Sequence, residues 1–159
     1  VGGNGAVDQL DFLKENNIPV IVSRPHRLPD NEDDDPKAAF KIASQLVNSG
    51  LLVSIDVSGS MERMNTRNLP FYAGSFAAYG LDKEEALQLI TLNSAKILGI
   101  NDKLGSLEVG KHATLFLSKG DALDMRTNII EHAFISGREL SLETHQTELW
   151  KRYSKKFQK

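Results

Sequence analysis

The sequence contains no cysteine among its 159 residues, and its four histidines are scattered along the chain. Without cysteine there is no disulfide framework, no thiolate zinc site and no cysteine nucleophile. Neither His-x-His nor His-Glu-x-x-His occurs, so the chain encodes no local metal-binding motif. No glycine-rich nucleotide-binding fingerprint lies between a strand pattern and a helix pattern, apart from the short glycine cluster at residues 2–5.

Long apolar runs and a charge imbalance are also missing. No apolar run approaches the roughly 20 residues that a membrane span needs. The 19 basic and 21 acidic residues leave a formal net charge of −2, which gives no electrostatic reason to expect nucleic acid or an acidic membrane surface. A hydrophobic content of 40% and a charged content of 25% exclude a disordered chain.

The first residues show neither an initiator methionine nor a charged-then-apolar signal region, because the chain opens on Val1 and a glycine cluster. We therefore expect a part of a longer protein. The lack of cysteine fits an exported and a cytoplasmic protein equally.

Composition predicts three segments. Residues 1–100 alternate strand-like apolar runs with helical patterns, which is typical of α/β units with a parallel sheet. Residues 101–142 carry short apolar runs separated by glycine and charge, which predicts a small β element. Residues 143–159 place apolar side chains at helical spacing, which predicts a helix docked by one face. The predicted helices are 6–16, 36–49, 70–79, 83–90 and 94–98, and the predicted strands are 19–23 and 51–55.

Three side chains are expected to cap these helices. Asp35 precedes a proline that suits the first helical position. Asp82 and Glu85 have the spacing of a capping box. Asn93 is expected to cap the last short helix of this segment.

The two predicted strands are each followed by a long polar loop, 24–34 and 56–68. Both exceed the usual 2–6 residues of such a connection, whereas the turns on the opposite side are short. Loops that leave the C-terminal ends of parallel strands share one face, and α/β proteins build their sites there. The candidate functional residues on this face are Arg24, His26, Arg27, Asp56, Ser58, Arg63, Arg67 and Asn68.

Each candidate has a structural alternative. Arg24 and Arg27 either contact a substrate or pair with the acidic run 31–35. His26 is either a ligand or proton shuttle, or a loop residue with an ordinary hydrogen bond. Asp56 closes a buried strand, so its carboxylate either caps the following loop or takes part in catalysis. The run at 58–60 lacks the Gly-x-Ser-x-Gly pattern of a nucleophile elbow, and we exclude that role.

A specific family resemblance covers almost the whole chain, from Gly2 to about Leu140, and its clearest motifs lie in the second half. Residues 87–100 read LQLITLNSAKILGI, and residues 105–117 read GSLEVGKHATLFL. Together they closely resemble the C-terminal signature of the amidohydrolase superfamily, in particular the imidazolonepropionase-like metal-dependent hydrolases. Residues 129–140 are similar to the closing hairpin of that group's small β domain, and residues 67–74 to the segment after its last barrel strand. Two positions depart from the pattern: Ser94 replaces a proline and Thr114 replaces an aspartate.

The resemblance implies a fold and a division of the chain. The fold is α/β, the C-terminal part of a (β/α)₈ TIM-type barrel plus a small β element of the side domain. Residues 1–100 would form the last βα units of the barrel. Residues 101–142 would form a β-sandwich-like segment, and residues 143–159 a C-terminal helix.

The resemblance also implies an activity, which is metal-dependent hydrolysis of a C–N bond in a cyclic amide or amide-like small molecule. A divalent metal, zinc, would bind in the complete protein, with the other ligands upstream of this chain. Asp56 would be both the catalytic carboxylate and a metal ligand. The substrate-binding residues would be Arg24, His26, Arg67 and Asn68.

For the chain alone we expect no cofactor and no activity, and its partner would be the N-terminal portion of the barrel. Two alternatives stay open. One is a non-catalytic binding or scaffold protein, suggested by the unusual residues after Asp56 and by Thr114. The other is a separately expressed half that associates with its complement. Association of the chain with further copies of itself, as a homo-oligomer, also stays open.

Overall fold

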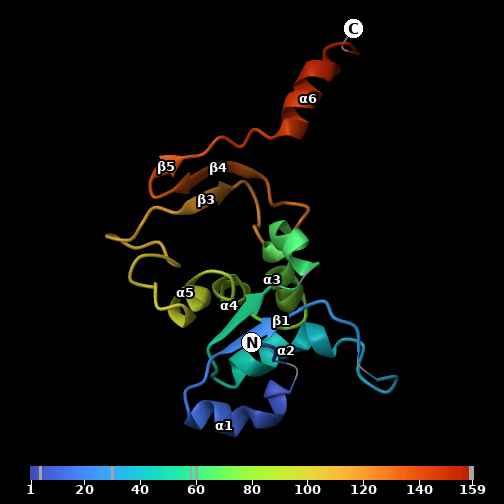
Figure 1. The fold of residues 1–159 in the computed structure, drawn as a ribbon, viewed down its shortest axis with the longest axis vertical. Helices are drawn as coiled ribbons and strands as arrows, with labels where there is room; N and C mark the ends of the chain where they lie inside the picture. Colours follow the sequence, from blue (N-terminus) through green and yellow to red (C-terminus); the bar gives the residue numbers. More distant parts are fainter. Residues whose placement is uncertain (4, 30, 58, 60, 158–159) are drawn as a thin grey trace.

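The computed structural model describes residues 1–3, 5–29, 31–57, 59 and 61–157. Two separate sheets organise the chain (Figure 1). The first is a parallel pair, β1 (Val20–Ser23) and β2 (Val53–Asp56). The second is antiparallel, with strands in the order β3 (Leu115–Ser118), β4 (Ile130–Ile135) and β5 (Arg138–Glu139). The predicted mixed α/β class is confirmed.

Helices flank the parallel pair and connect it to the second sheet. In chain order they are η1 (Ala6–Gln9), α1 (Leu10–Glu15), α2 (Ala38–Asn48), η2 (Glu62–Asn68), α3 (Leu69–Ala78), α4 (Lys83–Gln88), α5 (Leu92–Ile97) and α6 (His145–Ser154). The two η elements are 3-10 helices. The predicted helix 6–16 is therefore a 3-10 turn that continues into α1. The predicted loop 56–68 ends in η2.

The parallel sheet follows from its apolar residues and from the helix between its strands. Parallel strands need a crossover connection, which α2 supplies between β1 and β2. Val20 pairs with Val53 and Val22 pairs with Ile55. All four side chains are buried in one core.

The core gains its largest members from the neighbouring helices. Leu46 of α2, Phe76 of α3 and the core residue Leu89 have no exposed surface. Burying a side chain of this size contributes about 1.5–3 kcal/mol relative to leaving it in water. The two strands are therefore fixed by helix packing as well as by their own hydrogen bonds.

The helix caps agree with the sequence in part. Asp82 accepts hydrogen bonds from the backbone N–H groups of Glu84 and Glu85, at 2.8 and 3.3 Å, so its predicted role is confirmed. Asp35 accepts one from Lys37, but α2 begins only at residue 38, because residues 36 and 37 form a turn. The expected start at residue 36 is wrong by two positions. Asn93 lies inside α5, so the expectation that it caps that helix is wrong.

The second sheet ends in a tight hairpin between β4 and β5. Ser136 and Gly137 both have positive φ, 50° and 77°, and glycine adopts this region without a steric penalty. The Ser136 N–H donates to the hydroxyl of Thr114 at 3.1 Å. Thr114, one of the two departures from the family pattern, therefore anchors this turn with its hydroxyl.

The C-terminal helix α6 lies at one end of the molecule, beyond the second sheet (Figure 1). All ten of its residues are described, and none of them is buried. The expectation that this helix docks by one face is therefore wrong for this structure. No helix in the described part of the chain is long and apolar enough to cross a membrane.

Candidate functional site

Three parallel segments end at the same edge of the first sheet. Gly2 forms an isolated parallel bridge with Val22, through hydrogen bonds of Gly2 N–H to the Ile21 carbonyl (2.9 Å) and of Ser23 N–H to the Gly2 carbonyl (3.1 Å). On the other side of β1, Ser23 pairs with Asp56 of β2. Three neighbouring parallel segments therefore end at one edge of the sheet, and α/β proteins place their sites at such an edge.

Asp56 is the last residue of β2 and is half-buried at this edge. Successive side chains of a strand point to opposite faces of the sheet, so Asp56 shares a face with Ser54. Val53 and Ile55 point to the other face, where both are buried in the core. The Asp56 carboxylate thus projects from the face opposite these two apolar side chains.

A pair of hydroxyl groups fastens that same face to α5. The oxygens of Ser54 and Ser94 lie 2.7 Å apart, and each lies 2.9 Å from the Leu89 carbonyl oxygen. Ser54 is almost fully buried, so its hydroxyl needs these partners. Ser94, the other departure from the family pattern, thus holds β2 two residues before Asp56.

His26 lies against α2 and α3. Its ring makes edge contacts with Phe40 and Tyr72, at centroid distances of 5.2 and 4.6 Å. Its Nε2 lies 2.8 Å from the Ser75 hydroxyl oxygen, which in turn lies 3.0 Å from the Phe71 carbonyl oxygen. Desolvation by these neighbours lowers the pKa of His26. This is the ordinary hydrogen bond of the structural alternative, and a role in substrate binding stays a prediction.

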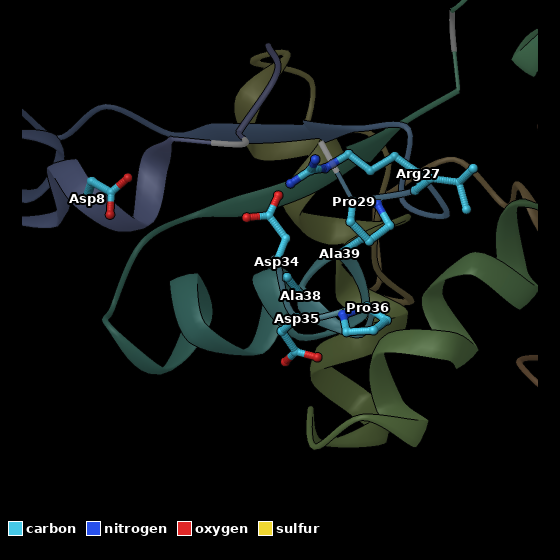
Figure 2. A pocket seen from close by; sticks show the side chains of 9 residues that line it. Asp8, Arg27, Pro29, Asp34, Asp35, Pro36, Ala38 and Ala39 are labelled. Carbon is cyan, nitrogen blue, oxygen red and sulfur yellow. The ribbon is translucent and has the colours of Figure 1, made fainter. Parts of the chain in front are cut away.

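The two arginines after β1 occupy different places. Arg24 is exposed and adopts a positive φ of 51° directly after the strand. Arg27 lines a pocket of about 420 Å³ between its own loop and the start of α2, together with Asp8, Asp34 and Asp35. In Figure 2 the Arg27 side chain points toward Asp34, which supports the alternative that it faces the acidic run. The sequence did not predict this pocket, because Asp8 joins it from η1.

The remaining candidates lie on the segment after β2. Arg67 is exposed and Asn68 is half-buried, at the end of η2 where the chain enters α3. The Arg63 N–H donates to the Gly59 carbonyl at 3.2 Å. Ser58 lies outside the described residues. The structure therefore brings Asp56, Ser23 and Arg24 to the same strand edge, and it places Arg67 and Asn68 on a separate element.

Metal binding at this edge has one candidate ligand. Among residues 1–3, 5–29, 31–57, 59 and 61–157, no group of three His, Asp or Glu side chains could hold a metal ion. Zinc in catalytic sites takes three protein ligands, and carboxylate oxygen is one of the accepted donors. Asp56 fits as one such donor at a strand end. The described residues fit a contribution to a metal centre but do not form a whole one.

Residues 22–140 match the profile of the Amidohydrolase family, and the chain belongs to that family. The chain is 37% identical to the imidazolonepropionase of Syntrophobacter fumaroxidans over 79 residues. This alignment covers 49% of this chain and 19% of that protein. Over 116 residues it is 28% identical to the 5′-deoxyadenosine deaminase of Methanobrevibacter smithii, covering 67% of this chain and 27% of that protein. The chain thus matches less than a third of the length of these relatives.

A solved structure gives the same family relation in three dimensions. An amidohydrolase from Thermotoga maritima MSB8 superimposes with a TM-score of 0.72 at 27% identity, covering 87% of this chain and 35% of that one. The resemblance seen in the sequence motifs is therefore confirmed.

Proposed function

We propose that residues 1–100 supply the last βα units of a (β/α)₈ barrel whose site lies at the strand edge that carries Asp56. The parallel pairing of β1 with β2 and the further parallel bridge of Gly2 support this proposal, because they give three neighbouring strand positions in sequence order. Residues 101–142 would form the small β segment beside the barrel, and residues 143–159 a C-terminal helix.

The proposed reaction is hydrolysis of a C–N bond in a cyclic amide or amide-like small molecule. One relative is by name a deaminase, an enzyme that removes an amino group, and others are imidazolonepropionases. The observation that carries the proposal is the position of Asp56, a carboxylate at the C-terminal end of a parallel strand and on the face opposite Val53 and Ile55.

Asp56 would act as general base and then as general acid. Its carboxylate would accept a proton from the attacking water and pass that proton to the leaving nitrogen. A divalent metal ion, zinc by expectation, would lower the pKa of the water and polarise the bond under attack when bound. Asp56 would be one of its ligands, and the others would come from earlier strands. Substrate contacts are proposed for the four candidates Arg24, His26, Arg67 and Asn68.

The non-catalytic alternative has less support than the sequence suggested. Part of its motivation was Thr114, where the family has an aspartate. The Thr114 hydroxyl anchors the hairpin at Ser136, which belongs to the second sheet and not to the strand edge that carries Asp56. Thr114 therefore lies away from the strand edge that carries Asp56, and we keep hydrolysis as the proposed function.

The test is the variant Asp56→Asn in the protein that carries the complete barrel. Asn keeps the size of the side chain but cannot take a proton from water, and general acid–base groups contribute about 10²–10⁴-fold to rate. We expect kcat for C–N hydrolysis to fall by about that factor, with weaker metal binding by elemental analysis. Asp102→Asn, at an exposed turn, is the matched control and should leave both unchanged. Full activity in Asp56→Asn would remove Asp56 from the mechanism.

A further inference from the structure

The helix α6 presents an aromatic face to solvent. Trp150 and Tyr153 are 66% and 48% exposed, and Phe157, in the turn that follows the helix, is 84% exposed. Residues three and four apart lie on the same side of a helix, so Leu149, Trp150 and Tyr153 form one stripe, and Phe157 adds an exposed ring just after it. Exposed apolar groups gathered in this way mark an interaction site more often than single exposed residues do.

Basic side chains surround this stripe: Lys151 and Lys155 lie opposite it, and Arg152 and Lys156 lie beside it. All four are exposed. Residues 145–159 hold five of the 19 basic residues and one of the 21 acidic ones, which gives this stretch a formal charge of +4 and residues 1–144 a charge of −6. The near-neutral net charge of the whole chain is therefore the sum of a positively charged C-terminal stretch and a negatively charged remainder.

The helix is also stabilised by its own contacts. The Thr144 hydroxyl accepts the Thr147 N–H, and the Thr147 hydroxyl accepts the Thr144 N–H, which completes a reciprocal cap. Lys151 pairs with Glu143 just before the helix, and the Lys156 ammonium lies 5.4 Å from the centre of the Tyr153 ring. These contacts stabilise the helix locally and leave its aromatic face exposed.

We propose that α6 binds the surface of a membrane that contains anionic lipids. Helices that lie in a membrane interface combine lysine and arginine on one face with tryptophan, phenylalanine or leucine on the other. Tryptophan and tyrosine settle at the level of the lipid headgroups. The positive charge of the helix complements anionic headgroups, and its aromatic stripe would enter the boundary with the acyl chains. The body of the chain, with the opposite charge, would stay in solution.

Trp150 makes the proposal directly measurable, because it is the single tryptophan of the chain. The 159-residue chain is titrated with vesicles of phosphatidylcholine alone and with vesicles that also contain phosphatidylserine. We expect a blue shift of Trp150 emission and weaker acrylamide quenching with the phosphatidylserine vesicles. Raised salt should reverse both changes, since exposed charges are screened.

Two variants and a matched control separate the contributions. Arg152→Glu/Lys155→Glu should weaken binding to phosphatidylserine vesicles by at least about 25-fold, since each basic residue near an anionic surface contributes about fivefold. Lys14→Glu/Lys103→Glu makes the same charge change at exposed sites outside α6 and should bind as the unchanged chain does. Tyr153→Ser/Phe157→Ser keeps every charge and should lose the blue shift. Circular dichroism checks that each variant folds.

Three results would overturn the proposal. The first is an unchanged Trp150 spectrum with phosphatidylserine vesicles. The second is equal binding to both kinds of vesicle, which would show that charge has no part. The third is a blue shift that depends on protein concentration without vesicles, which would show that a second copy of the chain covers the helix.

Discussion

Gly74, in the middle of α3, allows a test of how α3 packs against the segment between β3 and β4 that contains Leu123. A Cβ atom at this position would lie 2.2 Å from the Leu123 carbonyl oxygen and 3.1 Å from its carbonyl carbon. An alanine in a helix interior is ordinarily more stable than glycine, by about 1 kcal/mol. Helix propensity therefore predicts that Gly74→Ala raises the free energy of unfolding, and the steric contact predicts that it lowers it. The larger of the two effects decides the outcome.

Neither side of this contact can move freely. Leu123 is buried in the core, and its N–H donates to the Asp121 carboxylate at 2.9 Å. On the helix side, Ala73 and Phe76 have no exposed surface. Overpacking of a well-packed site costs about 1–3 kcal/mol or more, and a backbone oxygen at 2.2 Å belongs at the upper end. We expect Gly74→Ala to lower the free energy of unfolding by about 1–2 kcal/mol after the gain in helix propensity.

The assay is urea denaturation followed by far-ultraviolet circular dichroism. Gly5→Ala is the control, because Gly5 has a negative φ of −95° and a Cβ there meets nothing within 4 Å. Gly5→Ala should stay within about 0.5 kcal/mol of the unchanged chain. If Gly74→Ala is as stable as Gly5→Ala, α3 does not pack against the Leu123 backbone as closely as these distances require.

Two further predictions concern buried polar contacts. Ser54→Ala and Ser94→Ala should each destabilise by about 1 kcal/mol. The double variant should destabilise by less than the sum, because either single variant already breaks the contact between the two hydroxyls, and strict additivity in denaturant midpoints would contradict this. The pKa of His26 is lowered by desolvation, so the unfolded chain binds the proton more readily, and stability should fall as the pH drops below about 6.5. His26→Gln should reduce this loss in denaturation series from pH 8 to pH 5, and an identical pH profile would refute the assignment.

Local patterns predicted much of the first segment. The apolar runs 19–23 and 51–55 gave both parallel strands, since a strand covered on both faces reads as continuous apolar sequence. The cap at Asp82 was also visible, because it depends on a side chain within a few residues of the helix start. The motif 87–117 identified the family without any structural information.

Contacts between distant residues were not predictable in this way. His26 bonds to Ser75, 49 residues away, and Ser54 to Ser94, 40 residues away, so no local pattern could reveal either partner. The expectation that the C-terminal helix docks by one face was wrong for a different reason. Periodicity predicted the α6 helix correctly but could not say what covers its aromatic face, and the net charge averaged its basic residues against an acidic body.

The sequence selected the candidate site by position alone. The rule that strand ends share an edge selected Asp56, and the structure places that residue at the end of β2, paired with Ser23. The same rule could not separate His26, which packs against α2 and α3, from the residues that stay at the edge. Chemistry at Asp56 remains the proposal on which the functional account depends.

Anomalous X-ray diffraction at the zinc absorption edge, on crystals of the protein that carries the complete barrel, tests that proposal most directly. We expect a metal ion at the C-terminal edge of the parallel strands, with an Asp56 carboxylate oxygen about 2.0–2.2 Å from it. A metal ion whose complete set of ligands excludes Asp56 would contradict the account.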